Sequence, residues 1–273
     1  MATIFRFEEF LTLPSFFFHN CGADLWGPSG GLMRRIVLFF AATNLLITFI
    51  AEFYYGAMKI KTDLIEATMA LTFVAFVLVS FGKYYYMVIG KNKMDEFLNR
   101  LFAIFPRTRT QQEDICLKYY IKYNSLVMRG YTALFIVAIS TYNVYALLKQ
   151  FIHTNIQHKH DLEPTAPYNA YYPWDWQHHW SYYVVYLSQS FAGWHAVSAQ
   201  VALDLLLCAT ATQLIMHYDH IARTLEKCKP KFAEARENTK GPHLARVAME
   251  LRLFDEDKRY ISGIVAYHVE VLR

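Results

Sequence analysis

The chain has 273 residues, of which 55% are hydrophobic, 17% aromatic and only 18% charged, and its formal net charge is +4. Soluble domains average about 45–50% apolar and about 25% charged residues, so this composition argues against a water-soluble domain and favours a protein that faces lipid. The basic residues are dispersed among acidic ones, which argues against a nucleic-acid-binding protein.

Four long and nearly uncharged segments predict membrane-spanning helices. A membrane helix needs about 20 mostly apolar residues, and each segment reaches that length when charged side chains at its ends extend to the interface. The fourth segment is too long for a single crossing, so we expect its end to project into the cytoplasm. A soluble bundle of buried helices is the alternative, but such helices rarely stay uncharged on every face over this length. The predicted spans are residues 33–58, 65–89, 130–152 and 180–216.

The distribution of Lys and Arg predicts the orientation of these spans. Both residue types are frequent in segments 90–129 and 217–273 and sparse in segment 153–179. Positive residues concentrate on the cytoplasmic side of membranes. Residues 1–32, 90–129 and 217–273 are therefore predicted to be cytoplasmic, and residues 153–179 to form an extracellular loop. The predicted fold is a single all-α integral membrane domain with a cytoplasmic amino terminus.

The last cytoplasmic segment contains a further predicted helix. Ile264, Val265, His268, Val271 and Leu272 recur at helical spacing, which predicts an amphipathic helix that reaches the last residues of the sequence. We expect the sequence to be partial, because it stops within this helix and no capping residue follows.

Cysteine and histidine usage gives no indication of a disulfide or a metal site. All four cysteines fall on or near the predicted cytoplasmic side, where thiols stay reduced. Of the close histidine pairs, only His217 and His220 are predicted to be cytoplasmic, and two ligands one helical turn apart do not complete a metal site. The other pairs are His158 with His160 and His178 with His179. The sequence also has no G-x-S-x-G, glycine-rich phosphate loop or H-E-x-x-H, so we expect no catalytic residues, no cofactor and no enzyme activity.

The segment "NAYYPWDWQHHWSYYVVY", residues 169–186, leads into the fourth span and is rich in Trp and Tyr. These residues favour the headgroup level of a membrane, so an interfacial anchor is one interpretation. The other interpretation is that some of the rings line the mouth of a ligand site.

Polar residues inside the spans have two possible roles. They can form hydrogen bonds between or within helices, or they can orient a small ligand in an apolar cavity. Asp204 is the most polar of them, and its position near the inner end of the fourth span predicts a basic partner such as Lys83.

The outward halves of the second, third and fourth spans each carry aromatic, polar and small residues at helical spacing. This combination suits a pocket for a small apolar molecule, and it equally suits ordinary packing between helices. The candidate pocket residues are Met69, Phe73 and Phe76 in the second span, Ile139, Tyr142, Asn143 and Ala146 in the third, and Tyr186, Gln189, Ser190 and Gly193 in the fourth.

Three motifs, taken in their order along the chain, resemble those of insect odorant receptors. They are "FHNCGADLWGP" before the first span, "YYPWD" before the fourth span and "YHVEVLR", Tyr267 to Arg273. The resemblance implies a seven-span receptor of which four spans are present. In that family the sixth span supplies part of the ligand pocket and the last span lines the pore.

The resemblance also implies a function. The chain would belong to a tuning subunit of an odorant-gated cation channel, which binds a small volatile hydrophobic odorant and assembles with a shared co-receptor in a heterotetramer. Its location would be the plasma membrane of olfactory sensory neurons. A gustatory-type chemoreceptor, or a four-span membrane enzyme or transporter, is the alternative, and the particular odorant does not follow from the sequence.

Overall fold

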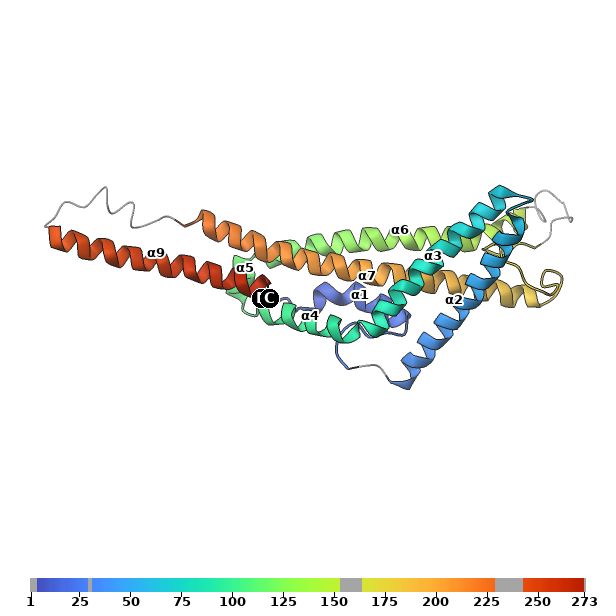
Figure 1. The fold of residues 1–273 in the computed structure, drawn as a ribbon, viewed down its shortest axis with the longest axis horizontal. Helices are drawn as coiled ribbons and strands as arrows, with labels where there is room; N and C mark the ends of the chain where they lie inside the picture. The colour runs from blue at the N-terminus through green and yellow to red at the C-terminus, as the bar shows by residue number, and fades with distance from the viewer. Residues whose placement is uncertain (1–3, 29–30, 153–163, 229–242, 273) are drawn as a thin grey trace. The chain divides into compact units, whose positions relative to one another are not determined.

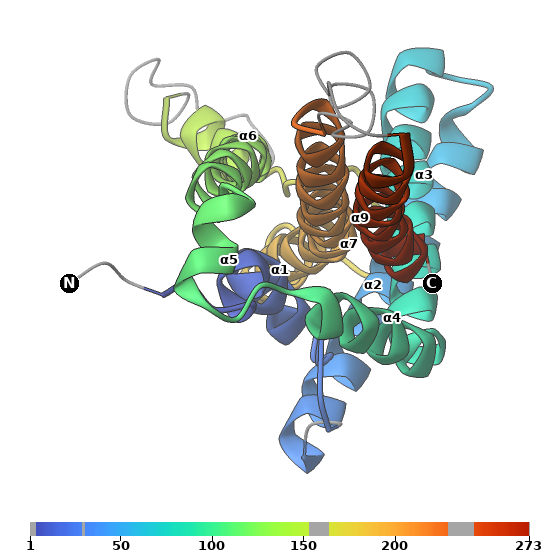
Figure 2. The same cartoon turned by 90° about the vertical axis from the view of Figure 1, so that its left-hand side faces the viewer.

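The computed structural model describes residues 4–28, 31–152, 164–228 and 243–272, and every regular element within these ranges is a helix (Figure 1, Figure 2). Parts of the predicted extracellular loop and of the last cytoplasmic segment, together with His158 and His160, lie outside the described residues. The helices are α1 (Glu8–Asn20), α2 (Leu32–Lys59), α3 (Leu64–Ile89), α4 (Lys91–Ile104), α5 (Arg109–Asp114), α6 (Leu117–Phe151), α7 (Ser181–Glu226) and α9 (His243–Leu272).

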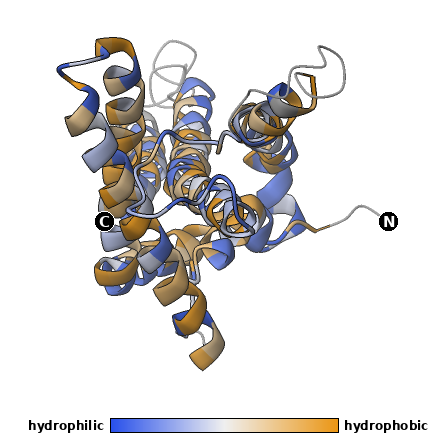
Figure 3. Ribbon diagram, turned by 90° about the vertical axis from the view of Figure 1, so that its right-hand side faces the viewer, coloured by the Kyte–Doolittle hydropathy of each residue, from blue (hydrophilic) through white to orange (hydrophobic). Residues whose placement is uncertain are grey.

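Four of these helices, α2, α3, α6 and α7, are long and apolar enough to cross a membrane. Their surfaces carry large apolar side chains that are more than half exposed, among them Ile50, Val79, Leu134 and Phe191. Figure 3 shows that hydrophobic residues are frequent along the helices. A water-soluble monomer rarely exposes so much apolar surface, whereas lipid covers it without cost. The predicted class, an all-α membrane protein, is confirmed.

Two of the helices extend beyond the predicted spans. Helix α6 begins at Leu117, within the segment that was predicted to connect the second and third spans. Helix α7 has 46 residues, which corresponds to about 69 Å at about 1.5 Å per residue. Hydrocarbon is about 30 Å thick, so α7 has to continue outside it. Helical hydrogen bonding therefore does not stop at the points where the hydropathy of the sequence changes.

The chain divides into two compact units. The first unit comprises residues 1–9, 99–124 and 209–273. Its aromatic core includes Phe7, whose ring centroid lies 5.5 Å from those of Phe102 and Phe105 in edge-to-face contacts. Gln112 fastens the amino-terminal segment to this core, because its side chain accepts a hydrogen bond from the Phe5 N–H at 3.1 Å and donates one to the Phe5 carbonyl at 2.9 Å.

The second unit comprises residues 10–98 and 125–208 and contains the antiparallel pair α2 and α3, which pack against each other. Asp63 sets the start of α3, since its carboxylate accepts hydrogen bonds of 3.0 Å from the N–H groups of Ile65 and Glu66. Asn44 joins α2 to α7 by donating to the Ser188 carbonyl at 2.8 Å. These contacts hold four helices around the cavity described next.

Candidate ligand-binding site

The second unit contains a cavity of about 290 Å³. Ligand pockets have volumes of about 300–1,000 Å³, so this cavity suits a small molecule at the lower end of that range. Helices α2, α3, α6 and α7 contribute to its wall, and one residue comes from the connection before α7. The lining residues are Thr48, Glu52, Met69, Thr72, Phe73, Phe76, Val77, Phe135, Ala138, Ile139, Tyr142, Tyr168, Gly193, Ala196 and Val197.

Three aromatic rings from three different segments form one part of the wall. The Phe73 ring lies 5.0 Å from that of Tyr142 and 4.6 Å from that of Tyr168, both in edge-to-face geometry. The rings of Tyr142 and Tyr168 are nearly parallel, with centroids 6.5 Å apart. Aromatic pairs in these geometries stabilise each other beyond the area that they bury. The wall therefore combines apolar faces with a fixed shape.

Tyr168 reaches the cavity from the connection between α6 and α7, and Gln189 of α7 holds it there. The fully buried Gln189 side chain accepts a hydrogen bond from the Tyr168 N–H at 2.9 Å and donates one to the Tyr172 hydroxyl at 3.3 Å. Burial raises the pKa of Tyr168, so its hydroxyl keeps its proton at physiological pH. The connection is also fixed to α2, because the Tyr171 N–H donates to the Ala51 carbonyl at 3.0 Å.

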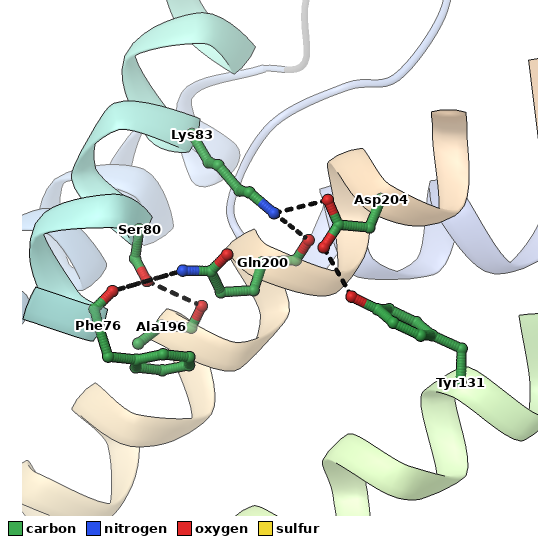
Figure 4. A network of polar contacts seen from close by, with 7 residues as sticks. All are labelled: Phe76, Ser80, Lys83, Tyr131, Ala196, Gln200 and Asp204. Atoms are coloured by element: carbon green, nitrogen blue, oxygen red, sulfur yellow. Dashed lines mark hydrogen bonds and ion pairs between the residues drawn. The ribbon is translucent and has the colours of Figure 1, made fainter. Parts of the chain in front are cut away.

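A polar network joins α3, α6 and α7 beside the cavity (Figure 4). Asp204 accepts a hydrogen bond of 2.7 Å from each of Lys83 and Tyr131, and Lys83 also donates to the Gln200 carbonyl at 3.0 Å. The Gln200 amide in turn donates to the Ser80 hydroxyl at 3.3 Å. The predicted pairing of Asp204 with Lys83 is confirmed.

This network continues into the cavity wall. The Ser80 hydroxyl oxygen lies 2.9 Å from the Phe76 carbonyl and 3.2 Å from the Ala196 carbonyl, so its single proton is shared between these two acceptors, and both residues line the cavity. The polar residues of the spans also include threonines that bond within their own helix: Thr72 donates to the Thr68 carbonyl and Thr141 to the Val137 carbonyl, each at 2.8 Å. Hydrogen bonds between helices, and hydrogen bonds from a side chain to the preceding turn of its own helix, thus account for these particular polar groups.

The structure brings six of the eleven predicted pocket residues together around the cavity. They are Met69, Phe73, Phe76, Ile139, Tyr142 and Gly193. The other five do not line it. Gln189 positions Tyr168, the Tyr186 hydroxyl donates to the carbonyl of Asn143, Ala146 is buried and Ser190 is half-buried. Six of the predicted residues thus border a cavity, the other five do not, and the role of the six in binding a ligand stays a prediction.

Nine of the fifteen lining residues were not among the predicted pocket residues, and three of these nine, Thr48, Glu52 and Tyr168, come from segments that were not expected to contribute. The first span was not expected to contribute. One signal was present, since Thr48 and Glu52 are four residues apart and therefore share a helix face within an apolar segment. No sequence pattern brings Tyr168 to the cavity, because its position depends on the path of a connection.

Metal-binding and thiol chemistry have no support in the described part of the chain. No group of three or more His, Cys, Asp or Glu side chains there is placed to hold a metal ion. His178 pairs with Asp175, its ring nitrogen Nδ1 lying 3.0 Å from a carboxylate oxygen. The four cysteines are free thiols.

The four helices that are long and apolar enough to span a membrane surround a largely apolar cavity, an arrangement that suits a membrane receptor for a small molecule. Residues 63–273 match the family model described as 7tm Odorant receptor. Since this match covers well over half of the chain, the protein belongs to the seven-transmembrane odorant receptor family. This is a family of receptors and not of enzymes.

Individual relatives agree with this assignment. The chain is 27% identical over 271 residues to Odorant receptor 85c and 28% identical over 272 residues to Odorant receptor 85b, both of Drosophila melanogaster. Each alignment covers 97% of this chain, and the chain spans 64% and 65% of the length of these relatives.

The fold is similar to that of a solved receptor. The insect olfactory receptor OR5 from Machilis hrabei, in its complex with eugenol, aligns with a TM-score of 0.64 at 13% identity, covering 97% of this chain and 67% of that one. At this identity the similarity establishes the fold alone.

Proposed function

We propose that the chain forms the odorant-binding part of a tuning subunit in an odorant-gated cation channel. The subunit assembles with a shared co-receptor in a heterotetramer in the plasma membrane of olfactory sensory neurons. The observation that carries the proposal is the cavity of about 290 Å³, with an aromatic and aliphatic wall, in a chain of the odorant receptor family. The matching Machilis hrabei receptor was solved with the small aromatic molecule eugenol, which agrees with a ligand of this size.

Binding in such a cavity draws mainly on the removal of apolar surface from water. A small odorant that buries about 200 Å² gains about 5 kcal/mol at about 25 cal/mol per Å². The three rings of Phe73, Tyr142 and Tyr168 come from α3, α6 and the following connection, so one ligand contacts several segments at once. The channel opens when the ligand binds the open geometry of these segments more tightly than the closed one.

The proposal is tested by truncating one wall residue. Tyr142→Ala enlarges the cavity and removes an aromatic face, so we expect the odorant dose–response curves to shift and the rank order of odorants to change. The measurement is calcium imaging of cells that express the complete reading frame containing this chain together with the co-receptor. Tyr145→Ala is the matched control, because Tyr145 lies on the same helix, is mostly exposed and does not line the cavity. Identical curves for both variants, at normal surface expression, would show that the cavity does not take part in odorant recognition.

A further inference from the structure

Two polar side chains of α2 border the largely apolar cavity. Glu52 and Thr48 lie one helical turn apart on the same face of the helix and are only 1% and 2% exposed. Among the described residues that line the cavity, Glu52 is the only acidic one, and none is Lys, Arg or His. Burying a carboxyl group in this setting is costly unless a partner is supplied.

Neither side chain is satisfied by the protein. The Glu52 Oε2 atom and the Thr48 hydroxyl have no hydrogen-bond partner within the described ranges. Thr48 differs in this respect from Thr72 and Thr141, whose hydroxyls bond to carbonyls of their own helices. Buried polar groups in native proteins are nearly always hydrogen-bonded, and among the unpaired groups of the described residues only these two also line the cavity, so a ligand bound there is placed to complete them.

The chemistry of the two groups defines what the ligand has to supply. A carboxyl group has an acceptor oxygen in either protonation state, so it requires a donor from the ligand. The threonine hydroxyl can both accept and donate. An alcohol or amine satisfies both groups at once. A ketone or ester can accept from Thr48, or from the O–H of a protonated carboxyl, but has no donor for the acceptor oxygen of Glu52, and a hydrocarbon satisfies neither group.

We propose that Glu52 and Thr48 form the polar end of the cavity and select small apolar molecules that carry a hydroxyl or amino hydrogen-bond donor. The aromatic rings and the aliphatic residues hold the hydrocarbon body of the ligand, and the α2 pair holds its head group. This inference rests on the proposed function, since it names the chemical class of ligand that the same cavity recognises. Sites built to hydrogen-bond a ligand donor discriminate strongly against analogues that lack it.

The test compares compounds of equal chain length in the co-receptor cell assay described above: 1-hexanol, hexylamine, 2-hexanone and hexane. With the wild-type chain we expect 1-hexanol and hexylamine to act at concentrations about tenfold or more below those of 2-hexanone and hexane. Glu52→Leu should abolish this preference and Thr48→Val should reduce it. Surface expression is measured for each variant by biotinylation.

Matched controls separate loss of recognition from loss of folding. Glu66→Leu removes a carboxylate that is already paired with Lys59 at 3.0 Å and Tyr55 at 2.8 Å and does not line the cavity. Thr141→Val removes a hydroxyl that bonds within its own helix, also away from the cavity. Both should leave the order of the four compounds unchanged. If Glu52→Leu does not reach the surface, Glu52→Gln, which keeps the volume and an acceptor oxygen, should retain the preference for 1-hexanol.

Two results overturn the inference. One is a wild-type receptor that responds to 2-hexanone or hexane as sensitively as to 1-hexanol. The other is a surface-expressed Glu52→Leu variant that keeps the wild-type preference, or a Glu52→Gln variant that loses it. Either result leaves the proposed function intact, because failure of that function appears instead as identical curves for Tyr142→Ala and Tyr145→Ala.

Discussion

The hydroxyl of Tyr168 occupies the space beside Gly193 that a side chain at this position would need. An ideal Cβ on Gly193 would overlap the Tyr168 hydroxyl and would lie 3.0 Å from Cζ of the same ring and 2.8 Å from Cδ1 of Ile139. The absence of a side chain on α7 thus allows a residue from the preceding connection to complete the cavity wall.

The first prediction follows from this close approach. Gly193→Ala should displace the Tyr168 ring and lower the sensitivity to all effective odorants by about tenfold, because overpacking of a well-filled site costs about 1–3 kcal/mol. Gly130→Ala is the control, since a Cβ at Gly130 meets nothing within 4 Å. Dose–response curves for both variants provide the measurement, and an unchanged response of Gly193→Ala would show that the ring can move without consequence.

The second prediction concerns Gln189, which holds the connection rather than lining the cavity. Gln189→Leu should leave the buried Tyr168 N–H unpaired and destabilise the protein by about 1–3 kcal/mol. Thermal unfolding of the purified chain in lipid nanodiscs measures this loss. Gln177→Leu is a suitable control, because the Gln177 amide bonds only to the Pro164 carbonyl near the surface, at 3.1 Å. Equal melting temperatures for the two variants would contradict the anchoring role.

The position of Gln189 shows which part of the site can be predicted from the sequence and which part cannot. Helical spacing places Met69, Phe73, Tyr142 and Gly193 on faces that meet in the folded chain, and all four line the cavity. The same spacing also selects Gln189, whose side chain turns toward the connection. Periodicity identifies a helix face but does not distinguish a residue that borders empty space from one that is covered by a neighbouring segment.

The fold itself is more predictable than the site. Long uncharged segments identify α2, α3, α6 and α7, because lipid imposes a length and a composition on any helix that crosses it. The pairing of Lys83 with Asp204 could also be anticipated, since a charge in a span requires a partner. The start of α6 at Leu117 could not be anticipated, because the polar residues near it are as compatible with a helix outside the membrane as with a connecting segment.

The third prediction tests that pairing. Lys83→Met and Asp204→Leu should each lower the melting temperature in nanodiscs, while the double variant should lose less than the sum of the two. Because the two side chains are 19% and 36% exposed, we expect a coupling free energy of about 1 kcal/mol. Exactly additive losses would show that the pair contributes nothing to stability.

The fourth prediction uses the difference between two thiols. Burial raises the pKa of the Cys21 thiol to about 12, whereas Cys116 is exposed. Only about one Cys21 thiol in 10,000 is ionised at pH 8, and the thiolate is the reactive form. Maleimide should therefore modify Cys116 first, and labelling of Cys21 should accelerate as the pH rises toward 12. Mass spectrometry of the labelled peptides checks this order, which denaturant should abolish.

The fifth prediction concerns membrane topology. In a background without native cysteines, Asp175→Cys should react with a membrane-impermeant maleimide in intact cells, because residues 153–179 are predicted to be extracellular. Lys93→Cys should react only after permeabilisation, although both positions are exposed in the structure. Labelling of both positions in intact cells would refute the alternating orientation of the spans.

Tyr168 reaches the ligand cavity from a connection, and this has an evolutionary consequence. Connections accept substitutions and changes of length more readily than packed helices do. A duplicated receptor gene can therefore acquire a new odour range through changes in residues 164–172 while the surrounding helical frame stays as it is. We expect differences in odour range between recently diverged paralogues to concentrate in this short stretch.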